Sequence, residues 1–141
     1  MAVHVLAVLA YKQGDRVTSS YLASSVNTNP VIVRRLLLTL QKAKLVDTSK
    51  GAGSGSRLER SPARISLAEV YKAVEEDDAF AMPSREPNKG CPVGQCIQDE
   101  LERVFTSAEN AMIDQLARVT VADVVNSVRA KCSNKKEANA G

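Results

Sequence analysis

Three cysteines are the side chains of this sequence best suited to reactive chemistry. Cys91 precedes a proline, and Cys96 lies near the predicted start of a long helix, where the helix dipole favours a thiolate. Either thiol could oxidise, pair with the other, or pair across a dimer, so Cys91 and Cys96 are redox-switch candidates. The structural alternative is that Cys91 caps or packs at the helix start and Cys96 is a small hydrophobic residue. Cys132, in a polar segment, is interpreted as incidental.

A metal or iron–sulfur site would need more ligands than these cysteines supply. Cys91 and Cys96 provide half of the four thiolates that a cluster requires, and Cys132 is far along the chain. His4 is the sole histidine and has no second ligand at a metal-binding spacing. We therefore expect no resident metal or cofactor, with an iron–sulfur cluster as the less favoured alternative. His4 is interpreted as an ordinary surface or core residue.

Catalytic motifs are weak in this sequence. Gly51, Gly53 and Gly55 have the spacing of a phosphate-binding loop, but such loops connect a buried strand to a helix, whereas this one joins two ribbon strands. No histidine is available to activate a serine or a cysteine. The acidic run at residues 75–78 is typical of a solvated helix end. The sequence therefore predicts a protein that is not an enzyme.

Basic residues offer a different chemistry, the recognition of a polyanion. Residues 1–72 contain 11 Lys and Arg against 4 Asp and Glu, a net charge of +7, whereas residues 73–141 contain 8 against 12, a net charge of −4. Arg34 and Arg35 lie one turn into a predicted helix, where they could contact guanine in a bidentate manner or hold phosphates. The opposing interpretation is a solvated face. Six further cations would add sequence-independent attraction: Lys42, Lys44, Lys50, Arg57, Arg60 and Arg64.

Three short helices are predicted to position these arginines. Apolar residues at helical spacing predict a first helix over residues 1–11, and Thr18 is a good N-cap for the second. Asn29 with Pro30 starts a third helix, which runs to about Lys44. The opposite face of this third helix is polar and cationic, because its predicted buried stripe is Val33, Leu36, Leu37 and Leu40.

A β-ribbon and a fourth helix follow. Two β-prone segments, 45–48 and 57–60, flank the glycine-rich turn and predict a ribbon with a flexible tip. Ser66 and Glu69 form a capping box for the next helix. Three helices, a ribbon and a helix are the order of a winged helix-turn-helix, so the predicted fold is mostly α with a small β-ribbon wing. The major groove of B-DNA admits one such helix, and a ribbon can lie along the backbone or in the minor groove.

A long apolar stripe follows a proline-rich loop that contains two of the cysteines. Its members step by three and four residues, and they are Ile97, Leu101, Val104, Phe105, Ala108, Met112 and Leu116. A helix of this length exceeds the needs of so small a core, so we expect a long C-terminal dimerisation helix that pairs two subunits. Thr120 with Asp123 resembles a second capping box and opens a last helix.

Length and composition favour one domain with an appendage. The 141 residues are 44% apolar and 4% aromatic, with no signal-peptide pattern and no long apolar run. We expect a cytoplasmic protein that does not bind membranes, and the odd cysteine count argues against a secreted disulfide scaffold. The predicted parts are a DNA-binding domain (1–75), a loop with cysteines (76–96), dimerisation helices (97–131) and a disordered tail (132–141).

Several segments resemble the Rrf2 family of bacterial transcriptional regulators, the family of IscR, CymR and NsrR. They are residues 28–46, the wing at 48–58, and 62–75. Residues 27–31 and 91–94 are most similar to uncharacterised Bacillus-type members that lack a three-cysteine cluster motif. The resemblance covers about residues 1–130. It implies a homodimer that crosses its long helices and binds a pseudo-palindromic operator in double-stranded DNA.

The sequence departs from the family pattern in two places. Cluster-binding members have three closely spaced cysteines, whereas this chain has Cys91, Cys96 and then none until Cys132. The family wing usually reads Arg-Gly-x-x-Gly-Gly-Tyr, and the matching positions here are Lys50, Gly51, Ser54, Gly55 and Ser56. The resemblance therefore implies the fold strongly. It implies less strongly that the wing contacts a DNA groove or that the protein holds an iron–sulfur cluster.

The predicted function is a dimeric, sequence-specific DNA-binding transcriptional regulator, specifically a repressor, with redox or thiol sensing through its cysteines as a hypothesis. The rival function is a winged-helix protein-interaction adaptor that does not read DNA sequence. Two arginines on the recognition face favour DNA, whereas an apolar patch there would favour the adaptor. The predicted DNA-contacting residues are Thr18, Ser19, Asn27, Thr28, Asn29, Val31, Arg34, Arg35, Lys42, Lys50, Gly51, Ser54 and Arg57.

Overall fold

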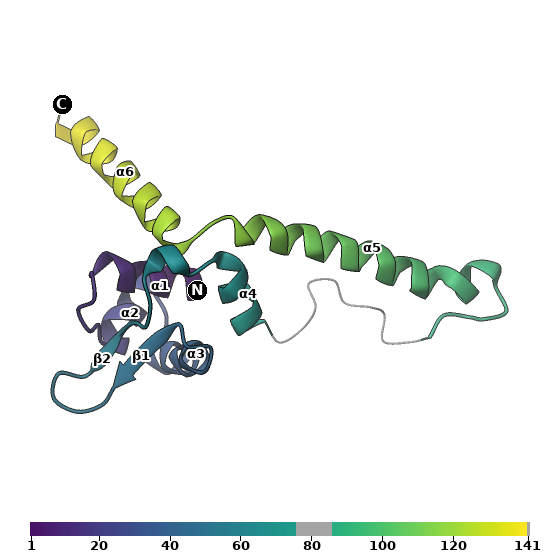
Figure 1. Ribbon diagram of the computed structural model, residues 1–141, viewed down its shortest axis with the longest axis horizontal. Helices are drawn as coiled ribbons and strands as arrows, with labels where there is room; N and C mark the ends of the chain where they lie inside the picture. The colour runs from purple at the N-terminus through teal and green to yellow at the C-terminus, as the bar shows by residue number, and fades with distance from the viewer. Residues whose placement is uncertain (76–85, 141) are drawn as a thin grey trace.

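The computed structural model describes residues 1–75 and 86–140, and its first part is a bundle of three short helices (Figure 1). They are α1 (Ala2–Tyr11), α2 (Ser19–Val26) and α3 (Pro30–Lys42). The Thr18 hydroxyl accepts a hydrogen bond from a backbone amide in the first turn of α2 at 3.2 Å. The Asn29 side chain does the same for α3 at 2.8 Å. Both residues therefore cap helices as the sequence predicts.

The third helix ends two residues before Lys44. Lys44 has a left-handed φ of 60°, and its amide donates to the Gln41 carbonyl at 2.9 Å. The next amide, that of Leu45, reaches back to the Leu40 carbonyl at 3.0 Å. A left-handed residue after a helix closes its last turn in this way and redirects the chain toward the wing. The sequence predicts that this helix runs to about Lys44, so the helical periodicity of the side chains overestimates its length by about two residues.

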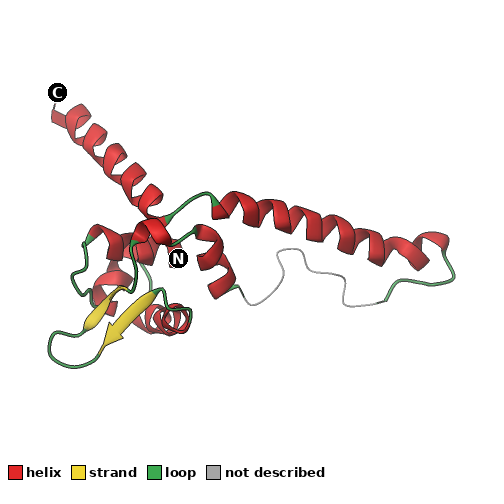
Figure 2. Ribbon diagram, in the orientation of Figure 1, coloured by secondary structure: helices red, strands yellow, loops and turns green. Residues whose placement is uncertain are grey.

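The wing is a two-stranded antiparallel ribbon, drawn as yellow arrows in Figure 2. Its strands are β1 (Val46–Ser49) and β2 (Gly55–Leu58), so the second strand starts two residues before the predicted 57–60. The backbones of Val17 and Ser56 exchange two hydrogen bonds, at 2.9 and 2.8 Å. This extra pairing with the α1–α2 loop fixes β2 from outside the ribbon, which explains why the pattern of the ribbon alone misplaces it.

Gly55 is the wing position that tolerates a side chain least. Its φ is +140°, and a Cβ there would meet backbone atoms of Val17 at 2.9–3.0 Å. We expect Gly55→Ala to lower the free energy of unfolding by about 1–3 kcal/mol, because it adds both strain and a backbone clash. Gly53→Ala is the matched control, since its φ is also positive but its Cβ would meet open space. Urea unfolding measures both, and equal losses would contradict the close approach to Val17.

One hydrophobic core joins the winged-helix elements to the start of the last helix. From the first half of the chain it buries Val5, Leu6, Leu9, Leu22, Val33, Leu37, Leu40, Leu45 and Val46. From later segments it buries Ile65, Val70, Val121 and Val125. Leu36 of the predicted stripe is half-buried against this core. The removal of these aliphatic side chains from water is the main stabilising term of the fold.

A short 3-10 turn and the capped starts of two helices complete the body of the molecule. We use this name for the winged-helix elements together with the start of the last helix. The turn is η1 (Pro62–Arg64), and α4 (Leu67–Val74) follows it with Ser66 accepting from the Glu69 amide at 3.2 Å. Thr120 and Asp123 form a reciprocal capping box at the start of the last helix, with bonds of 2.9 and 3.1 Å. Both capping sites that the sequence predicts in this half are therefore present.

Two long helices leave the body in different directions (Figure 1). They are α5 (Pro92–Ala117) and α6 (Val121–Ala140). Helix α5 begins five residues before Ile97. Residues 92–96, which the sequence assigns to a loop, are therefore helical. Residues 76–85 of that loop, with most of the acidic run, lie outside the described residues. In the described part of the chain, no helix is both long and apolar enough to span a membrane.

The predicted disorder of residues 132–141 is wrong for residues 132–140. Helix α6 continues through Ala140, although every side chain from Lys131 onward is exposed. The segment contains Ala, Lys and Glu, which favour helix, and no Pro or Gly before residue 141. An existing helix propagates without the cost of a new nucleus. Low hydrophobicity alone is therefore not sufficient to predict disorder in this segment.

Candidate nucleic-acid interface

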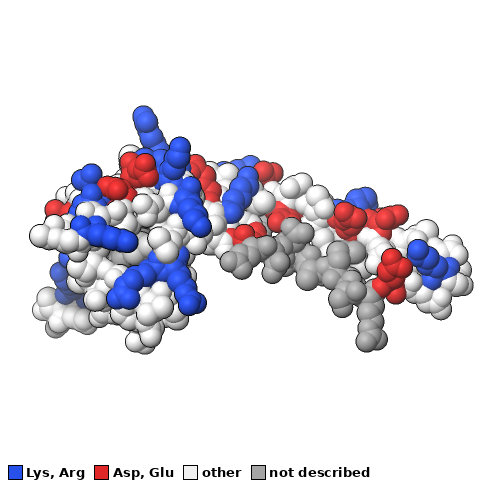
Figure 3. Space-filling model, turned by 90° about the horizontal axis from the view of Figure 1, so that it is seen from below, with Lys and Arg blue, Asp and Glu red and all other residues white. Residues whose placement is uncertain are grey.

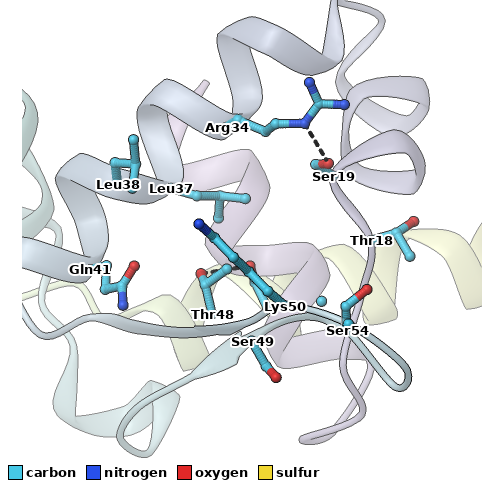
Figure 4. Close-up of a pocket in the computed structure, with 13 residues that line it drawn as sticks. Thr18, Ser19, Arg34, Leu37, Leu38, Gln41, Thr48, Ser49, Lys50 and Ser54 are labelled. Carbon is cyan, nitrogen blue, oxygen red and sulfur yellow. Dashed lines mark hydrogen bonds between the residues drawn. The ribbon is translucent and has the colours of Figure 1, made fainter.

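An open groove of about 480 Å³ lies between α3 and the wing. We call it the α3–wing groove. Figure 4 shows side chains of α3 on one side of this groove and side chains of the wing on the other. The N-terminus of α2 closes one end. Its lining residues are Thr18, Ser19, Arg34, Leu37, Leu38, Gln41, Thr48, Ser49, Lys50, Gly51, Ser54, Gly55 and Ser56.

Arg34 is held by the neighbouring helix. Its side chain is exposed, and its Nε donates a hydrogen bond to the Ser19 hydroxyl at 3.3 Å (Figure 4). This bond leaves the terminal guanidinium nitrogens available to an acceptor in the groove. Arg35 is also exposed, but it is not among the residues that line the groove. The structure therefore separates two arginines that the sequence could not distinguish.

The wing brings a second cation to the groove. Lys50 lies beside the wing tip, where Gly51 and Gly53 have φ of +93° and +72°. These left-handed glycines turn the chain between the two strands with little steric cost. The N-terminal end of α2, at Thr18 and Ser19, adds backbone N–H groups and the positive end of a helix dipole. The groove is thus chemically suited to an anion.

Six of the predicted DNA-contacting residues line this groove: Thr18, Ser19, Arg34, Lys50, Gly51 and Ser54. The turn before α3 holds three others, Asn27, Thr28 and Asn29; Asn27 has a left-handed φ of 62°, Asn29 caps the helix, and Val31 follows in the first turn of α3. Val31 is 47% exposed and Thr28 is half-buried. Lys42 is exposed at the C-terminal end of α3. These residues and Arg35 lie outside the groove itself, and DNA contact stays a prediction for them and for the six that line it.

Arg57 is the predicted contact whose charge is already engaged. Its Nε lies 3.4 Å from the Asp47 carboxylate, which also accepts a 2.9 Å bond from Arg16. Arg16 donates in addition to the Gly55 carbonyl at 3.1 Å. This network braces β1 against β2, so it gives Asp47 a structural role in the basic half of the chain.

Several groove residues were not predicted from the sequence. Leu38 is 60% exposed and Gln41 is exposed, and both follow Arg34 along one face of α3 at helical spacing. The signal was available, because Val31, Arg34, Leu38 and Gln41 recur at intervals of three and four residues. Ser56 is buried and bonded to the Thr48 hydroxyl at 2.9 Å, so this wing position supports the groove floor.

Charge is distributed unevenly over the surface. Figure 3 shows Lys and Arg gathered on the winged-helix body and Asp and Glu spread along α5. The acidic residues of α5 are Asp99, Glu100, Glu102, Glu109 and Asp114, against Arg103 as its basic residue. A polyanion is therefore attracted to the body and repelled by the long helix.

Comparison with known proteins identifies the family. The Rrf2 family profile, described as iron-dependent transcriptional regulator, matches residues 1–127. The chain belongs to the Rrf2 family. It is 40% identical over 126 residues to Bacillus subtilis YwnA, a proposed HTH-type transcriptional regulator, and the match covers 89% of this chain and 92% of YwnA.

Solved structures share the fold of this Rrf2 chain. A proposed DNA-binding protein matches with a TM-score of 0.70 and 39% identity, over 87% of this chain and 94% of its own. A proposed regulator from Lactobacillus plantarum matches with a TM-score of 0.76 over 97% and 95%, and its 23% identity shows the fold alone. The predicted winged-helix class and family are confirmed. The Rrf2 chain is a transcriptional regulator and not an enzyme, because its family and relatives are regulators.

The cysteines of this Rrf2 regulator are free and exposed. Cys91 is the N-cap residue of α5, and Cys96 lies in the second turn of that helix. The backbone N–H groups of Gly94 and Val93, in that order of effect, lower the pKa of the Cys91 thiol below its usual value. The lowering of a thiol pKa that the sequence predicts near the helix start is therefore present at Cys91, the N-cap residue. Cys132 is exposed on α6.

We expect Cys91 to react with iodoacetamide at lower pH in the folded protein than in urea. The lowered pKa means that the reactive thiolate is present at lower pH when α5 is formed. The Cys96→Ser/Cys132→Ser variant isolates Cys91, and mass spectrometry gives its alkylation rate between about pH 6 and pH 10. An identical pH midpoint in the folded and urea-unfolded protein would contradict this prediction.

Potential metal ligands are sparse in the described residues, which contain one histidine and three cysteines. There, no group of three or more His, Cys, Asp or Glu side chains lies close enough to hold a metal ion. His4 is exposed, and its Nε2 is 3.1 Å from the Ser25 hydroxyl. This placement agrees with the interpretation of His4 as a surface residue.

The predicted dimerisation residues lie on α5, and none of them is buried in the single chain. Val104 and Ala108 are exposed, whereas the others are half-buried: Ile97, Leu101, Phe105, Met112 and Leu116. An apolar stripe of this length remains accessible along the described part of the helix. Pairing of α5 with a second copy of the chain therefore stays a proposal.

Proposed function

We propose that this Rrf2 regulator is a homodimeric, sequence-specific DNA-binding repressor of the cytoplasm. In this proposal α3 enters the major groove of an operator, and the wing contacts the backbone or the minor groove. The observation that carries the proposal is the α3–wing groove, which Arg34, Lys50 and the N-terminus of α2 line together. The solved relative at 39% identity is itself a proposed DNA-binding protein, which supports the same function here.

In this proposal the cations of α3 and the wing have two different roles, base contact and phosphate contact. A helix fits the major groove of B-DNA, and an arginine on its outer face can donate two hydrogen bonds to guanine. Arg34 is suited to this role because Ser19 restricts its side chain before DNA arrives. Lys42 and Lys50 lie at the far end of α3 and on the wing, where they would neutralise phosphates.

Pairing through α5 supplies the two-fold symmetry. The helix has 26 residues, a length of about 39 Å at 1.5 Å per residue. Its apolar stripe is accessible, and burying it against a second copy would stabilise a dimer. Two α3 helices related by a two-fold axis would then read the two halves of a pseudo-palindromic operator.

The proposal is tested by fluorescence-anisotropy titration with DNA from upstream of the chain's own gene. Specific binding should exceed binding to a scrambled duplex, and both affinities should fall steeply with added salt because phosphate contacts release counterions. Equal affinity for both duplexes would remove sequence specificity. If neither duplex binds at low salt, DNA is not the partner.

The adaptor alternative has one specific observation in its favour. Val31, Ile32 and Leu38 are large apolar residues of α3 that are 46–60% exposed. An apolar recognition face suits a protein partner, although it also suits the methyl groups of thymine. The salt series separates the two functions, since an apolar protein contact weakens little with salt.

A thiol switch remains a hypothesis within the proposed function. Oxidation or modification of Cys91 would alter the start of α5 and, through the pairing helix, the spacing of the two α3 helices. We propose that mild oxidant then changes operator affinity in the wild type and not in Cys91→Ser. If the two proteins respond identically to oxidant, Cys91 has a structural role and the repressor function stands without the switch.

A further inference from the structure

A second groove lies on another side of the body, between α1, α2 and α6, and it takes no part in the proposed DNA contacts. Its volume is about 550 Å³. We call it the α1–α6 groove. Its lining residues are Val3, His4, Ala7, Val8, Tyr11, Lys12, Tyr21, Ser25, Val124, Val125 and Val128.

Aliphatic side chains form most of this groove. Val3, Ala7 and Val8 come from α1, and Val124 and Val128 from α6. Val128 is 46% exposed, so water reaches the apolar wall. Volumes of about 300–1,000 Å³ with mostly apolar walls and a few polar groups are typical of small-molecule sites.

The polar groups gather on the α1–α2 side. The Lys12 ammonium lies 4.8 Å from the centre of the Tyr21 ring, and the His4 imidazole lies 3.1 Å from the Ser25 hydroxyl. No Asp or Glu is among the residues that line the groove. Within the described part of the chain, Lys12 also makes no salt bridge. Its charge lies beside the apolar walls without an acidic side chain to balance it.

We propose that the α1–α6 groove binds a small apolar carboxylate, such as an arylalkanoic acid. The carboxylate meets the Lys12 ammonium, the apolar tail lies against Val8, Val124 and Val128, and the His4–Ser25 pair adds further polar atoms to the groove. Charge complementarity selects this class, because the groove offers a cation and hydrogen-bond donors but no acidic group for an amine. A neutral apolar molecule would leave the ammonium without a counter-charge.

This site is separate from the α3–wing groove, since the two share no lining residue. Binding of the acid therefore does not depend on DNA binding. Helices α1 and α2 nevertheless belong to the winged-helix unit, and α6 follows the proposed pairing helix. A ligand held among these three helices would touch both parts of the molecule.

The test uses 4-phenylbutyrate and its neutral counterpart 4-phenylbutan-1-ol, titrated by calorimetry into the full-length protein. We expect saturable binding of the acid with one site per chain. Lys12→Met keeps an apolar stem and removes the charge, so it should weaken binding of the acid about tenfold, which corresponds to one charge-assisted contact. The affinity for the alcohol should change less than about twofold.

Lys72→Met is the matched control, because Lys72 is an exposed lysine on α4 that does not line the groove. It should bind the acid as the wild type does. Ala7→Phe fills the groove and should abolish binding of the acid, with circular dichroism confirming that the protein remains folded. Equal loss in Lys12→Met and Lys72→Met, or no saturable binding of the acid to wild type, would overturn the proposal. The same holds if wild type binds no acid and Ala7→Phe converts a dimer to monomer, since the groove would then seat a second copy.

Discussion

Replacing Arg34 with alanine is expected to cost about 1–3 kcal/mol of operator binding and to relax specificity at the base pair that Arg34 reads. The reason is geometric. Arg34 lies on the exposed face of α3 and lines the α3–wing groove, and its hydrogen bond to Ser19 orders the side chain before binding. Anisotropy titrations with the operator and with single base-pair variants measure both effects.

Arg103→Ala is the control for this prediction. Arg103 is an exposed arginine on α5 whose guanidinium pairs with Glu100 three residues earlier, so its loss changes net charge equally without touching the groove. We expect it to leave specificity unchanged. If Arg34→Ala weakened all duplexes alike, Arg34 would be a phosphate contact, and if it weakened none, α3 would not be the recognition helix.

Replacing Leu101 with aspartate is expected to dissociate the proposed dimer and to reduce operator affinity by on the order of 100-fold or more. Leu101 belongs to the accessible apolar stripe of α5, and a carboxylate there would be desolvated by pairing. Each monomer would then bind one half-site without the gain in effective concentration that a linked second half-site provides. Sedimentation velocity reports the oligomeric state, and anisotropy reports the affinity.

Thr106→Asp is the matched substitution. Thr106 lies on the polar face of α5 with Asp99, Glu102 and Arg103, where an added carboxylate stays in water. It should leave the dimer and the operator affinity close to wild type. A Leu101→Asp protein that sediments as a dimer and binds the operator normally would show that pairing does not use this stripe.

Local chemistry accounts for the parts of the fold that could be predicted from the sequence. Thr18, Asn29, Ser66 and Thr120 each cap a helix, because a short polar side chain before an apolar periodic run satisfies an otherwise unpaired amide. The element order of a winged helix follows from these starts. The end of α3 and the start of β2 were less accurate, since Lys44 and Gly55 depend on backbone geometry and on pairing with Val17.

The candidate site was predictable in kind but not in detail. Arg34 could be chosen by its charge and helical position, Lys50 by its charge and its place beside the glycine-rich turn, and both line the groove. Leu38 and Ser56 were missed because exposed apolar and buried polar residues run against the rule used to assign faces. The difference between Arg34 and Arg35 depends on Ser19, fifteen residues from Arg34 in sequence, which no local pattern reveals.

Hydrogen–deuterium exchange of the full-length protein, with and without its operator duplex, tests whether the α3–wing groove is the DNA-binding surface. We expect protection of amides in the α2 N-terminus, α3 and the wing, together with unchanged exchange along α5. A scrambled duplex at the same concentration should protect these segments less. Operator-dependent protection that omits α3 and the wing would contradict the assignment of the α3–wing groove as the DNA-binding surface.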